Sequence, residues 1–338
     1  MGTVLHVTNG DGAAGLLKAS SLEGDVLAWR DPMHHGPFPA EADLKELSLI
    51  RGRYLAGPDL PEADVVRDFE LRNDHFKGAV RYDEVVLWFE HDLLDQLQLL
   101  QILDLVGSGH VCPRRLSMVC IDRFEGIDGF RGLGQLTPDQ AASLWPARQA
   151  VSEGEIALAS AGWAAFRSDD PTKLERFLEG DLSALPFLAA ALKRHLEEYP
   201  AADTGLTRTE RQILKLVAEG VMNPVDLFVQ NMELETVLFL GDWTTFSRIA
   251  GMCTGPHPLL SCEPGGTFRY PPSEQLSREA FTGQEFGLTP EGEEVHAGHS
   301  SARGLMHRDE WLGGVHLDSA EAMWMWERTG ERLILQEP

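Results

Sequence analysis

The stretch Val85–Val106, VVLWFEHDLLDQLQLLQILDLV, decides the fold. It opens with an apolar run that predicts a strand buried on both faces, and it continues as an apolar helix. Glu90, His91 and Asp92 stand at the junction, and Asp95 follows within one helical turn. Charged groups are costly to bury beside apolar neighbours. The junction therefore predicts either a solvated helix start or the working end of a site.

Segments on both sides of this stretch repeat the alternation of strand and helix. Further strands are predicted at Thr3–Thr8, Asp25–Trp29 and Arg115–Ile121. Helical patterns occupy Ala42–Leu55 and Glu62–Val80. Strands separated by helices are typical of a parallel sheet that is covered on both faces. The sequence therefore predicts an α/β fold for residues 1–125, with an open, mostly parallel sheet of Rossmann or flavodoxin type.

The remainder of the chain is predicted to be mainly helical. Residues 126–200 contain the glycine-rich stretch GIDGFRGLG, which predicts a mobile loop, and then three helices. Residues 206–300 predict a winged-helix-like domain, because a capping box in LTRTERQ opens the first of three helices and a hairpin follows. We expect the second strand of that hairpin at FRYPP, residues 268–272. Residues 301–338 end in a hairpin, MWMWERTGERLILQ.

Composition restricts the classes of function. The chain has 53 acidic and 29 basic residues, and its formal charge of −24 repels phosphate backbones and anionic membranes. The N-terminal sequence lacks the basic segment and the long apolar segment that make up a signal peptide, so a signal peptide is not expected. The four cysteines are far apart and show no C-x-x-C spacing, which predicts reduced thiols in a cytoplasmic protein. Nucleic acid and membrane are therefore disfavoured as partners.

Three of the predicted strands end in polar residues that are capable of chemistry. In an open parallel sheet the carboxyl ends of the strands share one edge, and ligands bind there. The candidate catalytic residues are His91 or His35 as the general acid or base, with Glu90 orienting the imidazole. No G-x-S-x-G, Walker A or H-E-x-x-H signature is present to support a more specific reaction.

The same strand ends offer residues for binding a substrate or a metal ion. The candidate substrate-binding residues are Asn9, Asp11, Arg30, Asp31 and Gln96. Arg30 is the candidate cation for an anionic substrate. Asp11 and Asp92 are candidates to hold a divalent metal ion through oxygen ligands.

Each segment also has an interpretation that involves no function. The alternatives are a tight turn at Asn9–Gly12, a helix N-cap at Asp92, an ion pair between Arg30 and Asp31, and a solvated loop at His34–His35. Glu90 and His91 have no comparable explanation at the end of an apolar strand. The functional interpretation therefore depends on the repetition of polar strand ends.

The winged-helix-like region is a poor candidate for reading DNA. Residues 206–250 contain four basic and six acidic residues, and the expected recognition helix, WTTFSRIAGM, carries one arginine. A DNA reader needs several cations on phosphates as well as base-reading side chains. Packing within the protein and contact with a protein partner, including a second copy of the chain, are the favoured roles.

Residues 1–122 resemble the bacterial family catalogued as domain of unknown function 1835. The resemblance lies in LHVTNGDGAAGLL, DVLAWRDPMHHGP and YDEVVLWFEHDLLDQLQLLQIL. The family's first motif often reads Asn-Gly-Asp-Ser, and Gly12 stands at the serine position here, which excludes a serine nucleophile at that turn. The winged-helix-like half is similar to regions that follow this domain in longer members. The resemblance implies motif boundaries and no established activity.

These observations predict an enzyme that acts on a small anionic substrate, phosphorylated or carboxylated. The reaction would be hydrolysis or transfer by acid/base chemistry, with or without a metal ion. The alternative is a regulatory protein in which the α/β domain senses a ligand and the winged helix contacts DNA or a protein. The sequence does not determine the substrate, the reaction or the oligomeric state.

Overall fold

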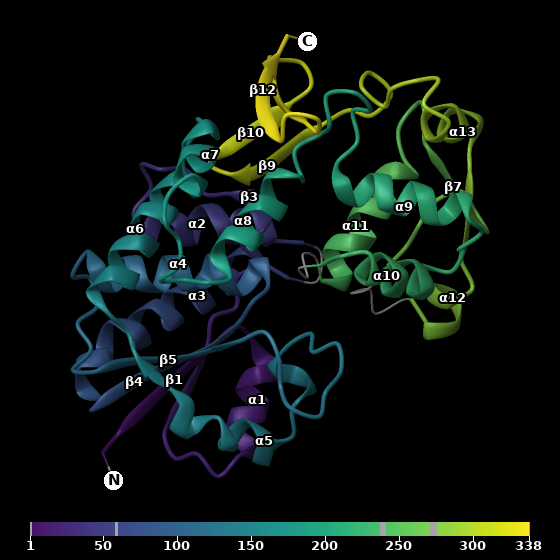
Figure 1. Cartoon of the computed structure of the whole chain (residues 1–338). Helices are drawn as coiled ribbons and strands as arrows, with labels where there is room; N and C mark the ends of the chain where they lie inside the picture. Colours follow the sequence, from purple (N-terminus) through teal and green to yellow (C-terminus); the bar gives the residue numbers. More distant parts are fainter. Residues whose placement is uncertain (1, 58–59, 237–240, 271–275, 338) are drawn as a thin grey trace. The chain divides into compact units, whose positions relative to one another are not determined.

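A computed structural model describes residues 2–57, 60–236, 241–270 and 276–337. The chain divides into two compact units (Figure 1). Residues 1–192 and 313–315 form the first unit, and residues 193–312 and 316–338 form the second. All four cysteines are free thiols, as predicted. In the described part of the chain, no helix has both the length and the apolar character required to cross a membrane.

The first unit is built on a five-stranded sheet with the strand order β2-β1-β4-β5-β6. Strands β2, β1, β4 and β5 are parallel, and β6 runs antiparallel to β5. The elements in chain order are β1 (Val4–Thr8), α1 (Asp11–Ala19), β2 (Asp25–Ala28), β3 (Gly36–Pro37), α2 (Leu44–Leu55), α3 (Glu62–Lys77), β4 (Glu84–Glu90), α4 (Leu93–Gly107), β5 (Leu116–Ile121), α5 (Pro138–Ser143), β6 (Gln149–Ala150), α6 (Glu153–Phe166) and α7 (Thr172–Leu178), followed by α8 (Leu188–Leu196), whose residues from Lys193 onward belong to the second unit. The predicted α/β fold with a mostly parallel sheet is confirmed.

Strand β4 is the buried centre of this sheet. All seven of its residues are buried, and it pairs with β1 on one side and β5 on the other. Because successive side chains of a strand point to opposite faces, β4 serves two layers. Val86 and Trp88 pack in one core with residues of α1 and α5. Leu87 and Phe89 face the opposite layer, which contains α4 (Figure 1).

The strand order reverses direction between β1 and β4. From β1 the chain moves outward to β2, and then it returns past β1 to form β4 and β5. In open α/β sheets such a switch point leaves a crevice at the carboxyl ends of the two strands, and ligands bind in it. Asn9 directly follows β1, and Glu90 is the last residue of β4. The topology therefore places these two residues at the expected binding edge.

The second unit consists of helices followed by short strands. Its elements are α9 (Arg208–Ala218), α10 (Pro224–Glu233), α11 (Asp242–Met252), β7 (Leu260–Glu263), α12 (Arg278–Thr282), β8 (Glu285–Leu288), α13 (Pro290–His296), β9 (Asp309–Gly313), β10 (Val315–Asp318), β11 (Met323–Glu327) and β12 (Arg332–Gln336). The predicted capping box is present, because Thr207 Oγ1 accepts a hydrogen bond from Glu210 N and Glu210 Oε2 accepts one from Thr207 N. The predicted C-terminal hairpin is β11–β12.

One local prediction is wrong. The antiparallel partner of β7 is β8, residues 285–288, and not residues 268–272. Phe268 is buried among aromatic rings, which draws it into the core rather than into strand pairing; residues 271 and 272 lie outside the described residues. The three helices predicted after the glycine-rich stretch are present as α6, α7 and α8, and a short further helix, α5, begins earlier, at Pro138.

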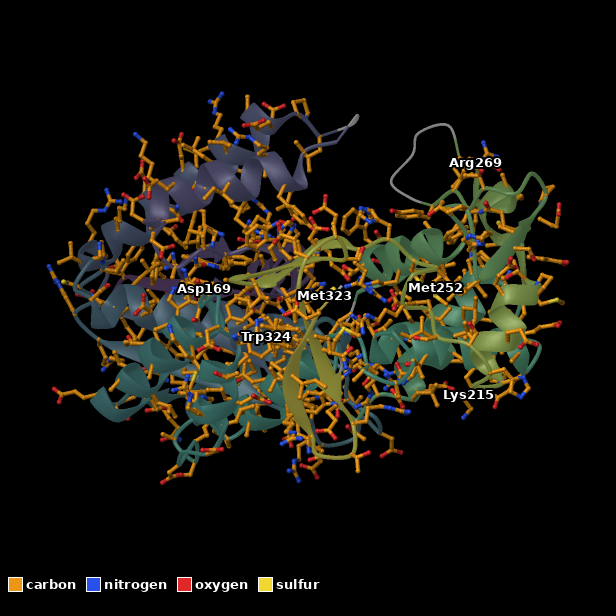
Figure 2. The ribbon with its side chains drawn as sticks, turned by 90° about the horizontal axis from the view of Figure 1, so that it is seen from above. Asp169, Lys215, Met252, Arg269, Met323 and Trp324 are labelled. Atoms are coloured by element: carbon orange, nitrogen blue, oxygen red, sulfur yellow. The ribbon has the colours of Figure 1, made fainter. Side chains whose placement is uncertain are left out.

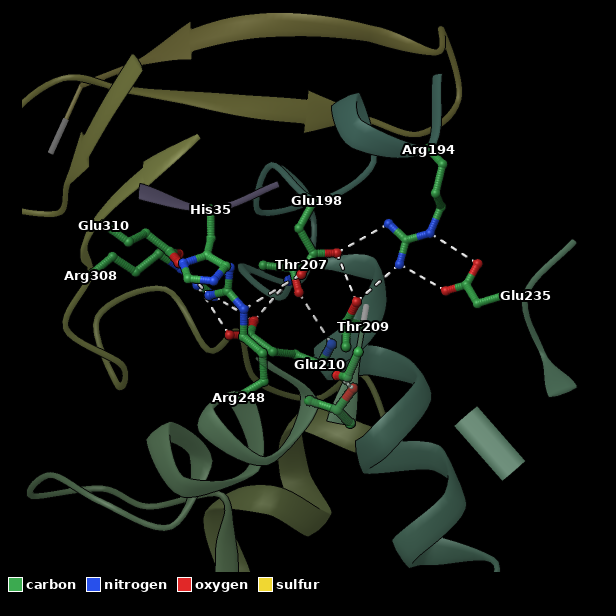
Figure 3. A network of polar contacts seen from close by, with 12 residues as sticks. His35, Arg194, Glu198, Thr207, Thr209, Glu210, Glu235, Arg248, Arg308 and Glu310 are labelled. Atoms are coloured by element: carbon green, nitrogen blue, oxygen red, sulfur yellow. Dashed lines mark hydrogen bonds and ion pairs between the residues drawn. The ribbon is translucent and has the colours of Figure 1, made fainter. Parts of the chain in front are cut away.

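A buried ionic network joins the helices of the second unit (Figure 3). Glu198 pairs with Arg194 at 3.1 Å and Arg248 at 3.6 Å, and it accepts a hydrogen bond from Thr209 at 2.8 Å. Arg248 also pairs with Glu310. Although burial alone raises the pKa of Glu198, the two arginines hold it below its usual value. The network is therefore a set of matched charges.

We predict that Glu198→Gln destabilises the protein by about 3 kcal/mol, since it leaves buried arginine charge without its partner. Denaturant unfolding of the full chain measures this loss. The control is Arg332→Gln, which breaks an exposed pair with Glu327 and should change stability by less than about 1 kcal/mol. Equal effects of the two substitutions would contradict the structural importance of the network.

Candidate functional site

Three carboxylates gather at the carboxyl end of β4. Glu90 ends the strand, Asp92 is the N-cap of α4, and Asp95 lies in the first turn of that helix. One carboxylate oxygen from each lies within 4.8 Å of the other two. Glu90 and Asp95 are 4 % and 0 % exposed, and Asp92 is partly buried. The strand-to-helix junction thus concentrates three acids in a largely dry site.

The turn after β1 contacts this cluster directly. Asn9 Nδ2 donates hydrogen bonds to Asp95 Oδ1 at 2.8 Å and to Glu90 Oε1 at 3.4 Å. Glu90 N donates to Asp95 Oδ2 at 2.7 Å, and Gln96 Nε2 donates to the Glu90 carbonyl oxygen at 2.7 Å. Residues about eighty positions apart therefore meet at the switch point. Of the sequence-predicted site residues, Asn9, Glu90, Asp92 and Gln96 are brought together here.

The glycine-rich loop closes over Glu90. Leu133 N donates a hydrogen bond to Glu90 Oε1 at 2.5 Å. Gly132 has a φ of +153°, and a Cβ atom at this position would collide with the Glu90 carboxylate. The glycines of this stretch predict a mobile loop, and they give no sign of the contact with Glu90. The available signal was the apolar residues Phe130 and Leu133 between the glycines, both of which are buried.

Burial is the largest influence on the electrostatics of the cluster. Burial raises the pKa of Glu90 to about 8, and the neighbouring Asp92 charge adds to the effect. Burial also raises the pKa of Asp92 to about 6 and that of Asp95 well above its usual value. The hydrogen-bond donors to Glu90 and Asp95 are the Asn9 amide and backbone N–H groups. Near neutral pH the cluster therefore retains protons unless a cation replaces them.

The opposite end of β4 carries a buried glutamate with the reverse electrostatics. Glu84 accepts hydrogen bonds from Arg148 at 3.1 Å, Ser117 at 2.7 Å and Arg115 at 2.5 Å. Burial alone would raise its pKa, but these donors lower it to about 2. Two arginines bind Glu84, whereas no basic side chain in the described ranges donates a hydrogen bond to the Glu90 carboxylate. This contrast marks the Glu90 end as the electrostatically incomplete one.

His91 lies between Glu90 and Asp92 in the chain and packs edge-on against Phe187, with ring centroids 6.2 Å apart. Its Nδ1 atom is buried and has no hydrogen-bond partner within the part of the chain that the structure describes. The proximity of His91 also lowers the pKa of Asp92, against the larger effect of burial. A ring nitrogen of His91 is therefore not committed to an internal hydrogen bond.

Arg30 and Asp11 form an ion pair at the surface. Arg30 binds Asp11 at 2.8 Å and Asp68 at 3.0 Å, and all three side chains are substantially exposed. Asp11 is not one of the clustered carboxylates. From the sequence, Arg30 is the predicted anion-binding residue, and Asp11 is a predicted metal ligand together with Asp92. In the structure, Asp11 and Asp68 already neutralise the charge of Arg30. The carboxylates that lie near Asp92 are those of Glu90 and Asp95, and Asp11 is not among them.

Asp31 and His35 belong to a separate buried cluster. Asp31 pairs with Arg51 at 2.7 Å, and both side chains are almost fully buried. His35 Nδ1 lies 3.2 Å from the Tyr54 hydroxyl oxygen, and the His35 carbonyl oxygen accepts a hydrogen bond from Arg51. Gln98 of α4 donates to the Asp31 carbonyl oxygen at 2.9 Å. These contacts hold the loop after β2 in place.

Comparisons with known proteins add little to this picture. No family model matches the chain, and no curated protein sequence is significantly similar to it. The chain is similar to the crystal structure of the Plasmodium falciparum topoisomerase II DNA-binding, cleavage and re-ligation domain, with a TM-score of 0.44 and 10 % identity. The match covers 99 % of this chain and 54 % of that one, so the chain spans about half its length. A similarity of this size assigns neither a family nor a function.

We predict that Glu90→Gln stabilises the metal-free protein at alkaline pH. The pKa of Glu90 in the folded state, about 8, lies above its ordinary value of 4.5. The contribution of Glu90 to the free energy of unfolding is therefore fully present below pH 4.5, and it is lost as the pH rises through 8. A neutral glutamine removes that loss, and we expect a gain of about 1–3 kcal/mol at alkaline pH and little change in acid.

Thermal melts of both proteins in acidic and alkaline buffer measure this difference. The matched control is Glu84→Gln at the other end of the strand. The pKa of Glu84 is lowered, so its contribution to stability is present above pH 4.5 and is lost as the pH falls through 2. Glu84→Gln should therefore destabilise the protein in alkaline buffer. A loss of stability in Glu90→Gln under the same conditions would show that Glu90 is a structural anion.

Proposed function

We propose that this protein is an enzyme that binds a divalent metal ion at the carboxyl ends of β1 and β4 and acts there on a small anionic substrate. The observation that carries the proposal is the cluster of Glu90, Asp92 and Asp95, whose oxygens converge without a basic side chain among their hydrogen-bond donors. Carboxylate oxygens are the ligands that Mg²⁺, Mn²⁺ and Ca²⁺ prefer. The cluster would hold such an ion in place of the protons that burial now favours.

The metal ion would also supply the charge that attracts the substrate. Arg30, the cation suggested by the sequence, is already neutralised by Asp11 and Asp68. Mg²⁺ is usually held in proteins by one or two carboxylates together with phosphate oxygens of a substrate. This preference favours a phosphorylated substrate over a carboxylated one. When bound, the ion would polarise a phosphoryl oxygen.

His91 is the proposed proton carrier of the reaction. It adjoins two of the three clustered acids in sequence, and its buried Nδ1 has no partner in the described residues. A histidine whose ring nitrogen is not held internally can accept or donate a proton at a reacting oxygen. Gln96 and Asn9 would orient the cluster through their hydrogen bonds to Glu90 and Asp95. The reaction class is hydrolysis or transfer of a phosphoryl group.

We further propose that residues 206–300 form a winged helix that packs or contacts protein rather than DNA. Helices α9, α10 and α11 followed by the β7–β8 pair support this assignment. Arg248, the one basic residue of α11, is only 15 % exposed and pairs with Glu198 and Glu310. It therefore cannot serve a phosphate without breaking the buried network. The relation of residues 1–122 to the domain of unknown function 1835 likewise stays a proposal and brings no activity with it.

The metal site is tested by titrating Mg²⁺ or Mn²⁺ into metal-free protein in a calorimeter. We expect saturable binding that releases protons and strengthens as the pH rises through 6 and 8, because the ion displaces protons from Asp92 and Glu90. Asp92→Asn and Glu90→Gln should each abolish binding. Asp11→Asn, the control at the sequence-predicted ligand, should bind normally.

Variants distinguish the two parts of this proposal, which are metal binding by the cluster and turnover of a substrate. His91→Ala should bind the metal ion as the wild type does but should lose turnover of a phosphate monoester. If Asp11→Asn binds no metal while Glu90→Gln binds normally, the cluster is not the ligand set. If metal binds without any phosphate-ester turnover, the alternative of a ligand-sensing domain is favoured over the enzyme.

For the winged helix we predict no measurable binding to random duplex DNA at physiological ionic strength. Non-specific binding depends on cations that neutralise phosphates, and the one cation of α11 is used internally. Fluorescence anisotropy with a labelled duplex at two salt concentrations is the measurement. Saturable binding that weakens steeply with added salt would overturn the assignment.

A further inference from the structure

The second unit contains a pocket in which cations outnumber carboxylates. Its volume is about 400 Å³, which falls within the range of roughly 300–1,000 Å³ that small-molecule sites occupy. The charged residues that line it are Arg208, Arg211, Lys215, Arg328, Glu197 and Glu331. In a chain with a formal charge of −24, a local excess of positive charge is unusual and calls for a physical explanation.

One face of α9 builds most of this pocket. Arg208, Arg211, Gln212 and Lys215 have the spacing i, i+3, i+4 and i+7, which places them on one side of the helix. The C-terminal hairpin closes the pocket from the other side with Trp326 of β11 and with Arg328. Lys215, labelled in Figure 2, is 56 % exposed.

Part of the charge in the pocket is already matched. Arg208 pairs with Glu197 and, at 3.1 Å, with Glu235. Arg328 pairs with Asp203. The basic side chains of the pocket therefore differ in their ability to bind an anionic ligand. Those with weak internal ion pairs can bind it most readily.

Arg211 and Lys215 have the weakest internal pairing. Arg211 donates a hydrogen bond to the Leu206 carbonyl oxygen at 3.2 Å, and no carboxylate in the described ranges forms an ion pair with it. Burial lowers the pKa of Arg211, and the neighbouring Arg328 lowers it further. Lys215 has only a distant exposed partner, Glu219 at 3.7 Å. A bound anion would offset the repulsion between the two arginines.

Gln212 adds a polar group to the same wall. Its Oε1 atom is buried and has no hydrogen-bond partner within the described residues. Buried polar atoms are normally paired, and unpaired ones often mark the place of a missing ligand or water. The Gln212 Oε1 atom can therefore accept a hydrogen bond from a hydroxyl group of a ligand, whereas anionic oxygens would be bound by the neighbouring cations.

We propose that this pocket binds a small dianion, a phosphate ester or a dicarboxylate, through Arg211 and Lys215. The guanidinium of Arg211 can donate two parallel hydrogen bonds to such a group. Trp326 supplies an apolar wall for the organic part of the ligand. The site is separate from the carboxylate cluster, and it does not depend on the function proposed for that cluster.

The experiment titrates inorganic phosphate, phenyl phosphate and succinate into the full-length protein in metal-free buffer at constant ionic strength. We expect saturable binding of at least one of them, weakened by added salt. Phosphate and succinate separate phosphoryl from carboxylate recognition, and phenyl phosphate reports the contribution of the apolar wall. Arg211→Gln and Lys215→Gln should each raise the Kd about tenfold, the effect of losing one charge-assisted hydrogen bond.

Controls separate this site from non-specific charge and from the first unit. Arg332→Gln removes an exposed cation of the same hairpin that does not line the pocket, and it should leave the Kd unchanged. Asp92→Asn should also leave it unchanged. The inference is overturned if none of the three anions binds, or if Arg332→Gln weakens binding as much as Lys215→Gln does. Loss of binding in Asp92→Asn alone would place the anion at the carboxylate cluster instead.

Lys215 is exposed, so its variant tests binding even if Arg211→Gln fails to fold.

Discussion

The cost of burying charge at the two ends of β4 is the constraint on which the first unit depends. This strand is buried along its whole length, yet it begins and ends with a glutamate. At the start of the strand, Arg115 and Arg148 form ion pairs with Glu84 and so offset the cost of burying its charge. These pairs also link the start of β4 to the segments around β5 and β6. At the other end, the donors to the Glu90 carboxylate among the described residues are the Asn9 amide and the Leu133 backbone N–H.

This asymmetry is what makes the carboxyl edge of the sheet a functional candidate. A purely structural acid would be expected to have a cation, as Glu84 does, or to be replaced by an apolar residue. Instead, the chain adds Asp92 and Asp95 next to Glu90 and then covers the group with the Gly132–Leu133 backbone. We propose that this arrangement binds a cation in exchange for protons. Its position at the switch point between β1 and β4 is where α/β sheets bind their ligands.

The second unit meets the same constraint with matched ion pairs. Its buried acids, among them Glu198 and Glu310, have arginine partners that keep them charged. This use of arginine inside the unit removes Arg248 from the surface of α11 and leaves Arg211 with a carbonyl oxygen as its acceptor. The distribution of cations, more than their number, therefore decides which surfaces of this acidic protein can attract an anion.

The strands, the main helices and the parallel sheet were predictable from the sequence, because they depend on local patterns. The apolar run of β4, the N-cap at Asp92 and the capping box at Thr207 each express a preference that operates within a few residues. The meeting of Asn9 with Glu90 was also predictable, since parallel strands end at one edge. Which charges are paired was not predictable. Only the tertiary structure brought Asp68 to Arg30, Arg51 to Asp31 and the backbone of Leu133 to Glu90, because ion pairing and desolvation depend on distances between segments that lie far apart in the chain.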